Sequence, residues 1–178
     1  SMKKKALALV LALTLLVAGV VGGTLAWLTD QTDEVKNTFT VGDINIGLTE
    51  TTADYKMVPG NTIAKDPTVT VKANSEACWL FVQVTESTDL KDFITYAIAE
   101  GWTALPGVDG VYYREVPASA ADQTFSVLAG DAVTVKSDVT RTMLETAKAD
   151  APTLTFQAYA IQRDHFATAD AAWAEVSK

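Results

Sequence analysis

The sequence predicts an all-β fold, an antiparallel β-sandwich with a few short helices. Two observations carry this prediction. Most of the chain after residue 38 consists of short segments that either alternate between apolar and polar residues or are continuously apolar, and Gly, Pro, Asn and Asp recur between these segments. Short strands at such spacing are typical of antiparallel sandwiches. The one cysteine, Cys78, lies in the apolar run 77–81, so we expect a buried, inert thiol and a domain stabilised by packing without an intrachain disulfide.

Each expected strand has its own signal. In residues 38–48 the apolar positions change phase at Gly42 and Asp43, which indicates a bulge or a tight bend. Pro67 precedes a valine alternation over 68–72, and a proline at the start of a strand removes no ladder hydrogen bond. Residues 77–85 are nearly all apolar and are expected to form a central strand. Further strands are expected at 94–99, 102–105, 111–116, 123–128, 132–139 and 153–162.

Three short helices are expected beside the strands. Residues 89–93 read as one helical turn capped by Thr88, and residues 141–149 as a short helix that stops before Pro152. At the end of the chain, Thr168 is expected to cap an amphipathic helix, because apolar residues recur behind it at helical spacing. These residues are Ala169, Ala172, Trp173 and Val176.

The first 26 residues have the three regions of a secretory signal peptide. Three lysines, residues 3–5, precede an apolar run over 6–21, and small side chains at Thr24 and Ala26 fit the cleavage rule of a signal peptidase. We therefore expect cleavage between Ala26 and Trp27, leaving residues 27–178 as one secreted domain in the extracellular matrix or on the cell surface. The alternative is a retained membrane anchor, but the run falls short of the roughly 20 residues that span a bilayer. Contact with a membrane is expected only through the uncleaved leader.

The charge balance disfavours several partners. The whole chain has a net charge of −8; the three lysines of the leader are lost on cleavage while no acid is, which leaves 11 basic against 22 acidic residues and a charge of −11. Nucleic acid and anionic membrane surfaces are therefore not expected as partners. Calcium is a minor alternative at Asp30 with Asp33 or at Asp89 with Asp92, although acids in exposed turns are usually only solvated.

The sequence contains little that points to catalysis. His165 is the only histidine, it stands beside Asp164, and it reads as a surface residue because no second zinc ligand lies at helical spacing. No H-E-x-x-H, no G-x-S-x-G and no glycine-rich phosphate loop occurs. The expectation is a protein that is not an enzyme, with no catalytic residues and no resident cofactor or metal.

The export junction and the first expected strand, residues 22–30 and 37–46, resemble those of the TasA/camelysin family. Pro59-Gly60 followed by residues 65–67 resembles the next block of that family, and residues 157–162 with Ala172-Trp173 resemble the close of some members. The family comprises secreted proteins of Gram-positive bacteria, released by a SipW-type signal peptidase. The resemblance implies a jelly-roll-like sandwich and biofilm-matrix fibres. It also implies, less strongly, the metalloprotease activity described for camelysin, because the chain has no zinc signature.

Cleavage would free an N-terminal arm over residues 27–41. Its acidic and amide residues keep it soluble, while its apolar residues could pack into a neighbouring subunit. These apolar residues are Trp27, Leu28, Val35, Phe39 and Val41. We expect this arm to complete the sheet of the next subunit, with Phe39 and Val41 setting the register. The expected function is a structural subunit of matrix fibres, whose partners are other copies of itself and the signal peptidase. The alternative is a binding, accessory or anchoring module on the cell surface.

Overall fold

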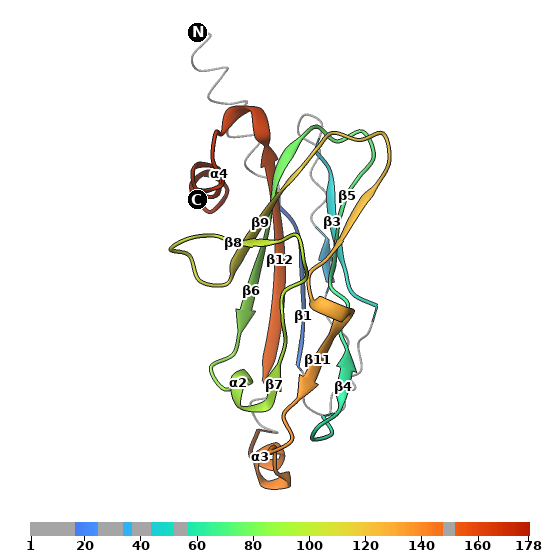
Figure 1. Ribbon diagram of the computed structural model, residues 1–178, viewed down its shortest axis with the longest axis vertical. Coiled ribbons are helices and arrows are strands. Elements are labelled where there is room, and N and C mark those ends of the chain that lie inside the picture. Colours follow the sequence, from blue (N-terminus) through green and yellow to red (C-terminus); the bar gives the residue numbers. More distant parts are fainter. Residues whose placement is uncertain (1–16, 25–33, 37–43, 52–56, 148–151) are drawn as a thin grey trace.

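The computed structural model describes residues 17–24, 34–36, 44–51, 57–147 and 152–178, the first two ranges by their backbone. All strand pairings among these residues are antiparallel. The strands form one six-stranded sheet and two three-stranded sheets. The six-stranded sheet is one layer of an elongated sandwich, and the two smaller sheets together form the other layer (Figure 1). The all-β fold that the sequence predicts is thereby confirmed.

The six-stranded sheet has the order β2-β1-β12-β6-β9-β8. The strand expected to be central, β6, does lie between β12 and β9, and β12 covers the predicted residues 153–162 from end to end. The bounds in this sheet are β1 Val17–Thr24, β2 Glu34–Lys36, β6 Cys78–Glu86, β8 Thr103–Ala104, β9 Val111–Val116 and β12 Thr153–Gln162.

The second layer consists of the two smaller sheets, β10-β5-β3 and β4-β11-β7. The valine alternation after Pro67 forms β5, whose Val69 and Val71 are fully buried while Thr68 and Thr70 are half-buried. The bounds are β3 Ile46–Thr49, β4 Thr62–Ala64, β5 Thr68–Val71, β7 Ile94–Thr95, β10 Gln123–Ser126 and β11 Ala132–Val135.

The large sheet is buried on both faces in its upper half. Leu80 and Val82 of β6 point into the core between the layers, together with Phe156 and Ala158 of β12. Cys78 belongs to the same face and is fully buried, and burial raises the pKa of its thiol to about 12, so the sulfur stays protonated and unreactive. The prediction of a buried cysteine is confirmed.

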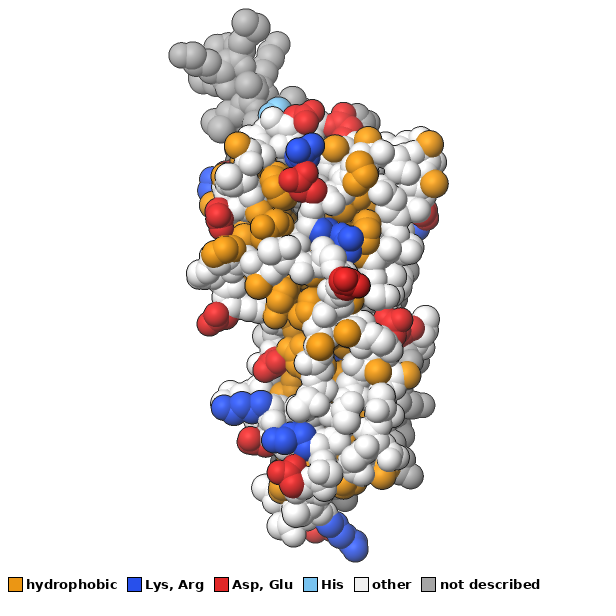
Figure 2. Space-filling view, viewed as in Figure 1, with side chains coloured by type: hydrophobic (Ala, Val, Ile, Leu, Met, Phe, Trp, Pro, Cys, Tyr) orange, Lys and Arg blue, Asp and Glu red, His pale blue; other side chains and the backbone are white. Residues whose placement is uncertain are grey.

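The outer face of that sheet is covered by the C-terminal helix α4, Ala169–Val176, which the Thr168 hydroxyl caps as predicted by accepting from the N–H of Ala171. The Trp173 ring lies 5.3 Å from the Phe81 ring and 5.2 Å from the Tyr159 ring, between centroids. Such aromatic pairs contribute about 0.5–1.5 kcal/mol each beyond the area they bury. Figure 2 shows hydrophobic side chains gathered in the part of this face near α4 and β8, with acidic groups dispersed around them.

Some predicted elements are shorter than expected. Helix α3 spans Arg141–Thr146 and is capped by Thr140, and α2 spans Leu90–Phe93 with Asp89, not Thr88, at the N-cap. The strand expected at 94–99 is regular only over β7, because the chain beyond it meets the opposite segment through a single bridge at Ile98. None of the helices in the described ranges has the length and apolar character needed to cross a membrane.

Candidate functional site

Strand β1 consists of residues that the sequence assigns to the leader, yet it lies within the six-stranded sheet. On one side it pairs with seven consecutive residues of β12, Thr153–Tyr159, through Val17 and residues 19–24. On the other side, residues 19–21 pair with β2. The backbone of this apolar stretch therefore has strand partners at both edges. We call the place in the sheet between β12 and β2 the β1 position.

The β1 position is next to the predicted cleavage junction. Strand β1 ends at Thr24, two residues before Ala26. A cut after Ala26 would separate β1 from the rest of the sheet. Ala26 and Trp27 lie outside the described residues, as do three arm residues, Leu28, Phe39 and Val41, while Val35 lies in β2. The cleavage and the role of the arm remain predictions.

A buried ion pair lies on the inner side of the β1 position. The ammonium nitrogen of Lys65 donates to Oε1 of Glu50 at 2.8 Å, and the two side chains are 0% and 1% exposed. Glu50 follows β3 and Lys65 follows β4, so the pair joins the ends of two strands from the two small sheets. The Lys65 ammonium also lies 5.5 Å from the centroid of the Phe156 ring, and Phe156 is the β12 residue opposite Val21 of β1.

Burial sets the electrostatics of this pair. Loss of hydration lowers the pKa of Lys65 below its ordinary value, and the Glu50 carboxylate opposes that shift by Coulombic attraction and a hydrogen bond. A charged pair inside a protein is tolerated only while its partners and its cover stay in place. Phe156, which pairs with β1 and lies beside the Lys65 ammonium, is the residue that links this buried pair to the β1 position.

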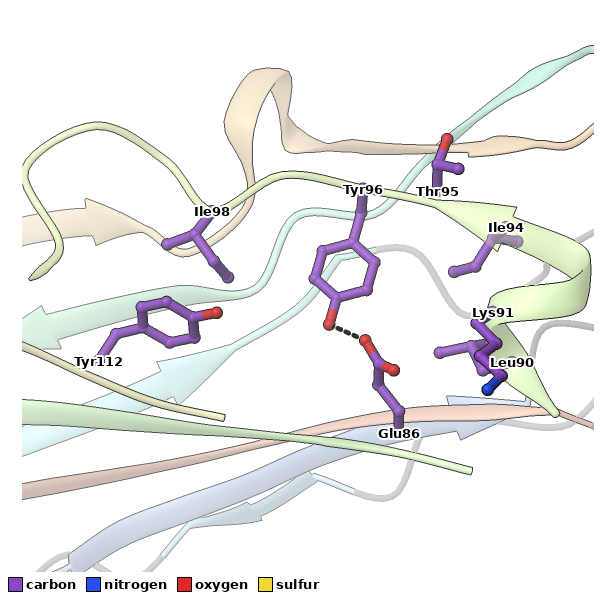
Figure 3. Close-up of a pocket in the computed structure, with 8 residues that line it drawn as sticks. All are labelled: Glu86, Leu90, Lys91, Ile94, Thr95, Tyr96, Ile98 and Tyr112. Atoms are coloured by element: carbon purple, nitrogen blue, oxygen red, sulfur yellow. Dashed lines mark hydrogen bonds between the residues drawn. The ribbon is translucent and has the colours of Figure 1, made fainter. Parts of the chain in front are cut away.

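A second feature is an open cleft of about 360 Å³ beyond the end of the β6–β9 ladder (Figure 3). Pairing with β9 stops because the chain turns at Gly110, whose carbonyl accepts from the Val84 N–H and whose missing Cβ would lie 2.5 Å from the Val84 carbonyl oxygen. The last β6 residues thus form one side of the cleft. Its lining residues are Glu86, Leu90, Lys91, Ile94, Thr95, Tyr96, Ile98 and Tyr112.

Two polar groups of the cleft are hydrogen-bonded to each other. Figure 3 shows the Tyr96 hydroxyl pointing at the Glu86 carboxylate, to which it donates a hydrogen bond. Burial, with this hydrogen bond and the negative charge of Glu86 as smaller causes, raises the pKa of Tyr96, so its hydroxyl remains a donor and not a base at neutral pH. The described lining contains no cysteine, serine or histidine that could act as a nucleophile or base. The cleft can accommodate an apolar group but shows no catalytic arrangement.

The candidate catalytic residues do not meet. His165 is exposed in a short 3₁₀ turn, Arg163–His165, next to the indole of Trp79, whose N–H donates to the Phe166 carbonyl oxygen. Cys78 is fully buried on the inner face of β6. A thiolate–imidazole pair between the two is not formed.

A substitution tests whether His165 has a catalytic role. His165→Ala is expected to leave the melting temperature and any proteolytic activity of a purified preparation unchanged, because the exposed imidazole donates and accepts no described hydrogen bond that holds an element in place. Differential scanning calorimetry and a casein-cleavage assay, with and without a chelator, measure both. A chelator-sensitive activity that disappears with this substitution would contradict the expectation.

The acidic pairs give no metal site in the part of the chain that the structure describes. The Asp89 carboxylate accepts a hydrogen bond from the Ser87 hydroxyl at 2.8 Å, within the turn before α2. Asp92 lies in that helix. Across the described ranges, no three His, Cys, Asp or Glu side chains are grouped so that they could hold a metal ion. Asp30 and Asp33 lie outside these ranges, so calcium at that pair remains the minor alternative that it was in the sequence.

Comparison with known protein families identifies the N-terminal part of the chain. Residues 1–88 match the family model described as camelysin metallo-endopeptidase. Over these residues the chain belongs to the camelysin/TasA family. No curated protein and no solved structure matches the chain.

The matched region contains the predicted leader and arm, the Lys65–Glu50 pair and the strands from β1 to β6. It ends just before α2, so most of the residues that line the cleft lie outside it. The resemblance inferred from the export junction is confirmed by this match. Three strands beyond the match, β8, β9 and β12, complete the six-stranded sheet to which β1 belongs.

Proposed function

We propose that this camelysin/TasA-family protein is a secreted structural subunit of extracellular matrix fibres, and that its subunits join by strand donation. One observation carries the proposal: a segment that export would remove, β1, occupies a two-sided position within the main sheet. Loss of that segment would leave β12, the longest strand of the described chain, with an unpaired edge.

An unpaired edge of this length favours capture of another strand. Seven residues of β12 would lose their partner, and exposed N–H and C=O groups in a row are a template for strand addition. The same loss would bring water toward the buried Lys65–Glu50 pair, so covering the position again is favourable. The arm that begins at Trp27 is the part of the mature chain available to provide this cover.

The other features agree with a structural role. A single histidine cannot form the two-histidine zinc site typical of metallo-endopeptidases, and the strongly acidic domain disfavours nucleic acid. The partners under this proposal are other copies of the chain, together with a SipW-type signal peptidase that opens the position. A retained leader would instead make the protein a cell-surface anchoring or binding module.

The proposal is tested by blocking cleavage. In a host that supplies a SipW-type peptidase, the natural sequence is expected to give a released product that begins at Trp27 and forms fibres in negative-stain electron microscopy. Ala26→Phe should keep the precursor in the membrane fraction and abolish the fibres, because signal peptidases require a small side chain at this place.

The matched control is Leu25→Phe, which adds similar bulk at the neighbouring position that the peptidase does not select, and should be processed normally. Intact-mass analysis reads the N-terminus in both cases. Release of the Ala26→Phe product at the natural level, or a released product that remains monomeric, would contradict the proposal. Membrane-bound natural protein with an intact leader would support the anchoring alternative.

A further inference from the structure

We propose that the edge of the sandwich beside Glu86 is a binding groove for a neutral oligosaccharide. The groove consists of two cavities: the cleft of about 360 Å³ in Figure 3, and a neighbouring cavity of about 460 Å³. Glu86, Tyr96 and Tyr112 line both cavities, so they lie where the two meet. The groove is on the β9 side of β6, whereas the β1 position lies beyond β12, so sugar binding here is independent of strand donation.

Two half-buried tyrosine rings form the aromatic part of the groove. Tyr112 comes from β9 and Tyr96 follows β7, and Figure 3 shows both hydroxyls turned toward the space around Glu86. Burial is the main cause of the raised pKa of Tyr96, and Tyr112 is close enough to be one of the smaller causes. Within the described ranges, neither ring packs against another aromatic ring or a cation. Such rings offer an apolar face to the C–H groups of a pyranose and a wet hydroxyl to its oxygens.

Side chains of the groove supply hydrogen-bond acceptors and a donor. The Tyr96 hydroxyl donates to Oε1 of Glu86, which leaves Oε2 of the same carboxylate as an acceptor. The Asp109 carboxylate and the Lys91 ammonium group are exposed, and neither pairs with another side chain in the part of the chain that the structure describes. Because a hydroxyl both donates and accepts, the hydroxyls of a sugar match this mixture of groups.

The end of β6 adds a backbone donor and acceptor. The Val84 N–H donates to the Gly110 carbonyl, and the Ser87 N–H donates to the Thr153 carbonyl on the opposite side. Backbone groups of successive strand residues point to alternate edges, so the N–H and C=O of Glu86 point to the groove side. No described residue pairs with them there, because pairing with the chain of β9 ends at Gly110. Glu86 therefore offers its main chain and its side chain to the same ligand.

These features fit a neutral sugar better than other classes of ligand. A wholly apolar ligand would bury the Glu86 carboxylate and N–H without partners, which is costly. An acidic sugar would be repelled by Glu86 and Asp109, and the Lys91 ammonium group in the same lining disfavours a polycation. An extended peptide would find a free strand edge of one residue, because β6 ends at Glu86, and that is too short for strand addition.

The experiment uses the full chain and an array of neutral hexasaccharides built from glucose, galactose, mannose or N-acetylglucosamine. At least one of them is expected to bind, and isothermal titration calorimetry with the soluble sugar then measures its affinity. That affinity should change less than about twofold between ~50 and ~500 mM salt, because the contacts are hydrogen bonds and ring packing and not charge pairs. Polygalacturonate, an acidic polysaccharide, should not bind.

Three variants place the sugar in the groove. Tyr112→Leu keeps apolar bulk at this position and removes the ring and hydroxyl, so binding should weaken at least tenfold. Asp109→Ala removes one exposed acceptor and should weaken binding about 3- to 10-fold, the usual effect of one hydrogen bond. The matched control is Tyr113→Leu, which removes the same ring from the next residue of β9, where it packs against Trp79 and Phe81. Its affinity for the sugar should stay within about twofold of the natural protein's, and thermal unfolding checks that each variant is folded.

Each contrary result identifies what fails. An array on which no neutral hexasaccharide binds would overturn the proposal. Equal affinities for the natural protein and Asp109→Ala, together with equal losses in Tyr112→Leu and Tyr113→Leu, would show that sugar binds elsewhere. Binding confined to the cationic hexamer of glucosamine, and lost at high salt, would show an acidic surface without a sugar site. Asp109 lies in an exposed turn, so Asp109→Ala decides the result even where Tyr112→Leu does not fold.

Discussion

Replacing Lys65 with methionine is expected to lower the free energy of unfolding by about 3–5 kcal/mol, the usual cost of breaking a buried ion pair from one side. The Glu50 carboxylate would keep its burial, 1% exposed, but lose the ammonium group 2.8 Å away. For a domain of this size each kcal/mol corresponds to about 2–4 °C, so the melting temperature should fall by roughly 10 °C. Urea denaturation followed by tryptophan fluorescence measures the change.

Two further variants identify the cause. The double replacement Lys65→Met/Glu50→Leu removes both charges and should recover most of the lost stability, because apolar residues of similar volume often replace a buried pair without loss. Lys72→Met removes the ammonium group of a half-exposed pair with Asp122 and should have a much smaller effect than Lys65→Met. An equal loss of unfolding free energy in Lys65→Met and Lys72→Met would show that burial of the Lys65–Glu50 pair is not the cause of the destabilisation.

The strands of the sandwich could be predicted where one residue in two is apolar. Residues 153–160 alternate, with Leu154, Phe156, Ala158 and Ala160 on the buried side, and residues 153–162 form β12 with the predicted ends. The strand expected at 94–99 was too long because its alternation continues through Tyr96 and Ile98, which line the cleft and make one bridge, not a ladder. Periodicity reports burial on one side, and it does not report whether a neighbouring backbone is present.

The site was harder to predict than the fold. Lys65 stands between Ala64 and Asp66 after a turn, which is where a solvated lysine is expected, and only the folded chain places it inside the sandwich against Glu50. The sequence does not predict strand β1, because the length of the apolar run 6–21 and the lysines before it indicate a signal peptide. The β-branched valines at its start, Val17, Val20 and Val21, were the available signal for a strand. A signal peptide and a buried strand both require apolar residues, so composition alone does not distinguish one from the other.

Removing residues 1–33 is expected to abolish fibre formation while leaving a folded monomer, whereas protein beginning at Trp27 assembles. The monomer that starts at Glu34 keeps both strands that flank the β1 position, β12 and β2, but lacks the residues of the arm that precede β2. It should therefore bind a synthetic peptide of residues 27–33, which can be measured by fluorescence anisotropy with a label at the peptide's N-terminus.

Protein that starts at Gly42 provides the comparison for that binding, because it lacks β2 and offers only the β12 edge. Three residues of β2 pair along β1, enough for about two hydrogen bonds to the inserted strand, each contributing roughly 0.5–1.5 kcal/mol net. The peptide should consequently bind the Glu34 form about 10- to 100-fold more tightly than the Gly42 form. A peptide with the same residues in scrambled order controls for composition and should bind neither form. Equal affinities for the two forms would show that the peptide does not pair with β2, and fibres from the Glu34 form would show that subunits join without donating residues 27–33.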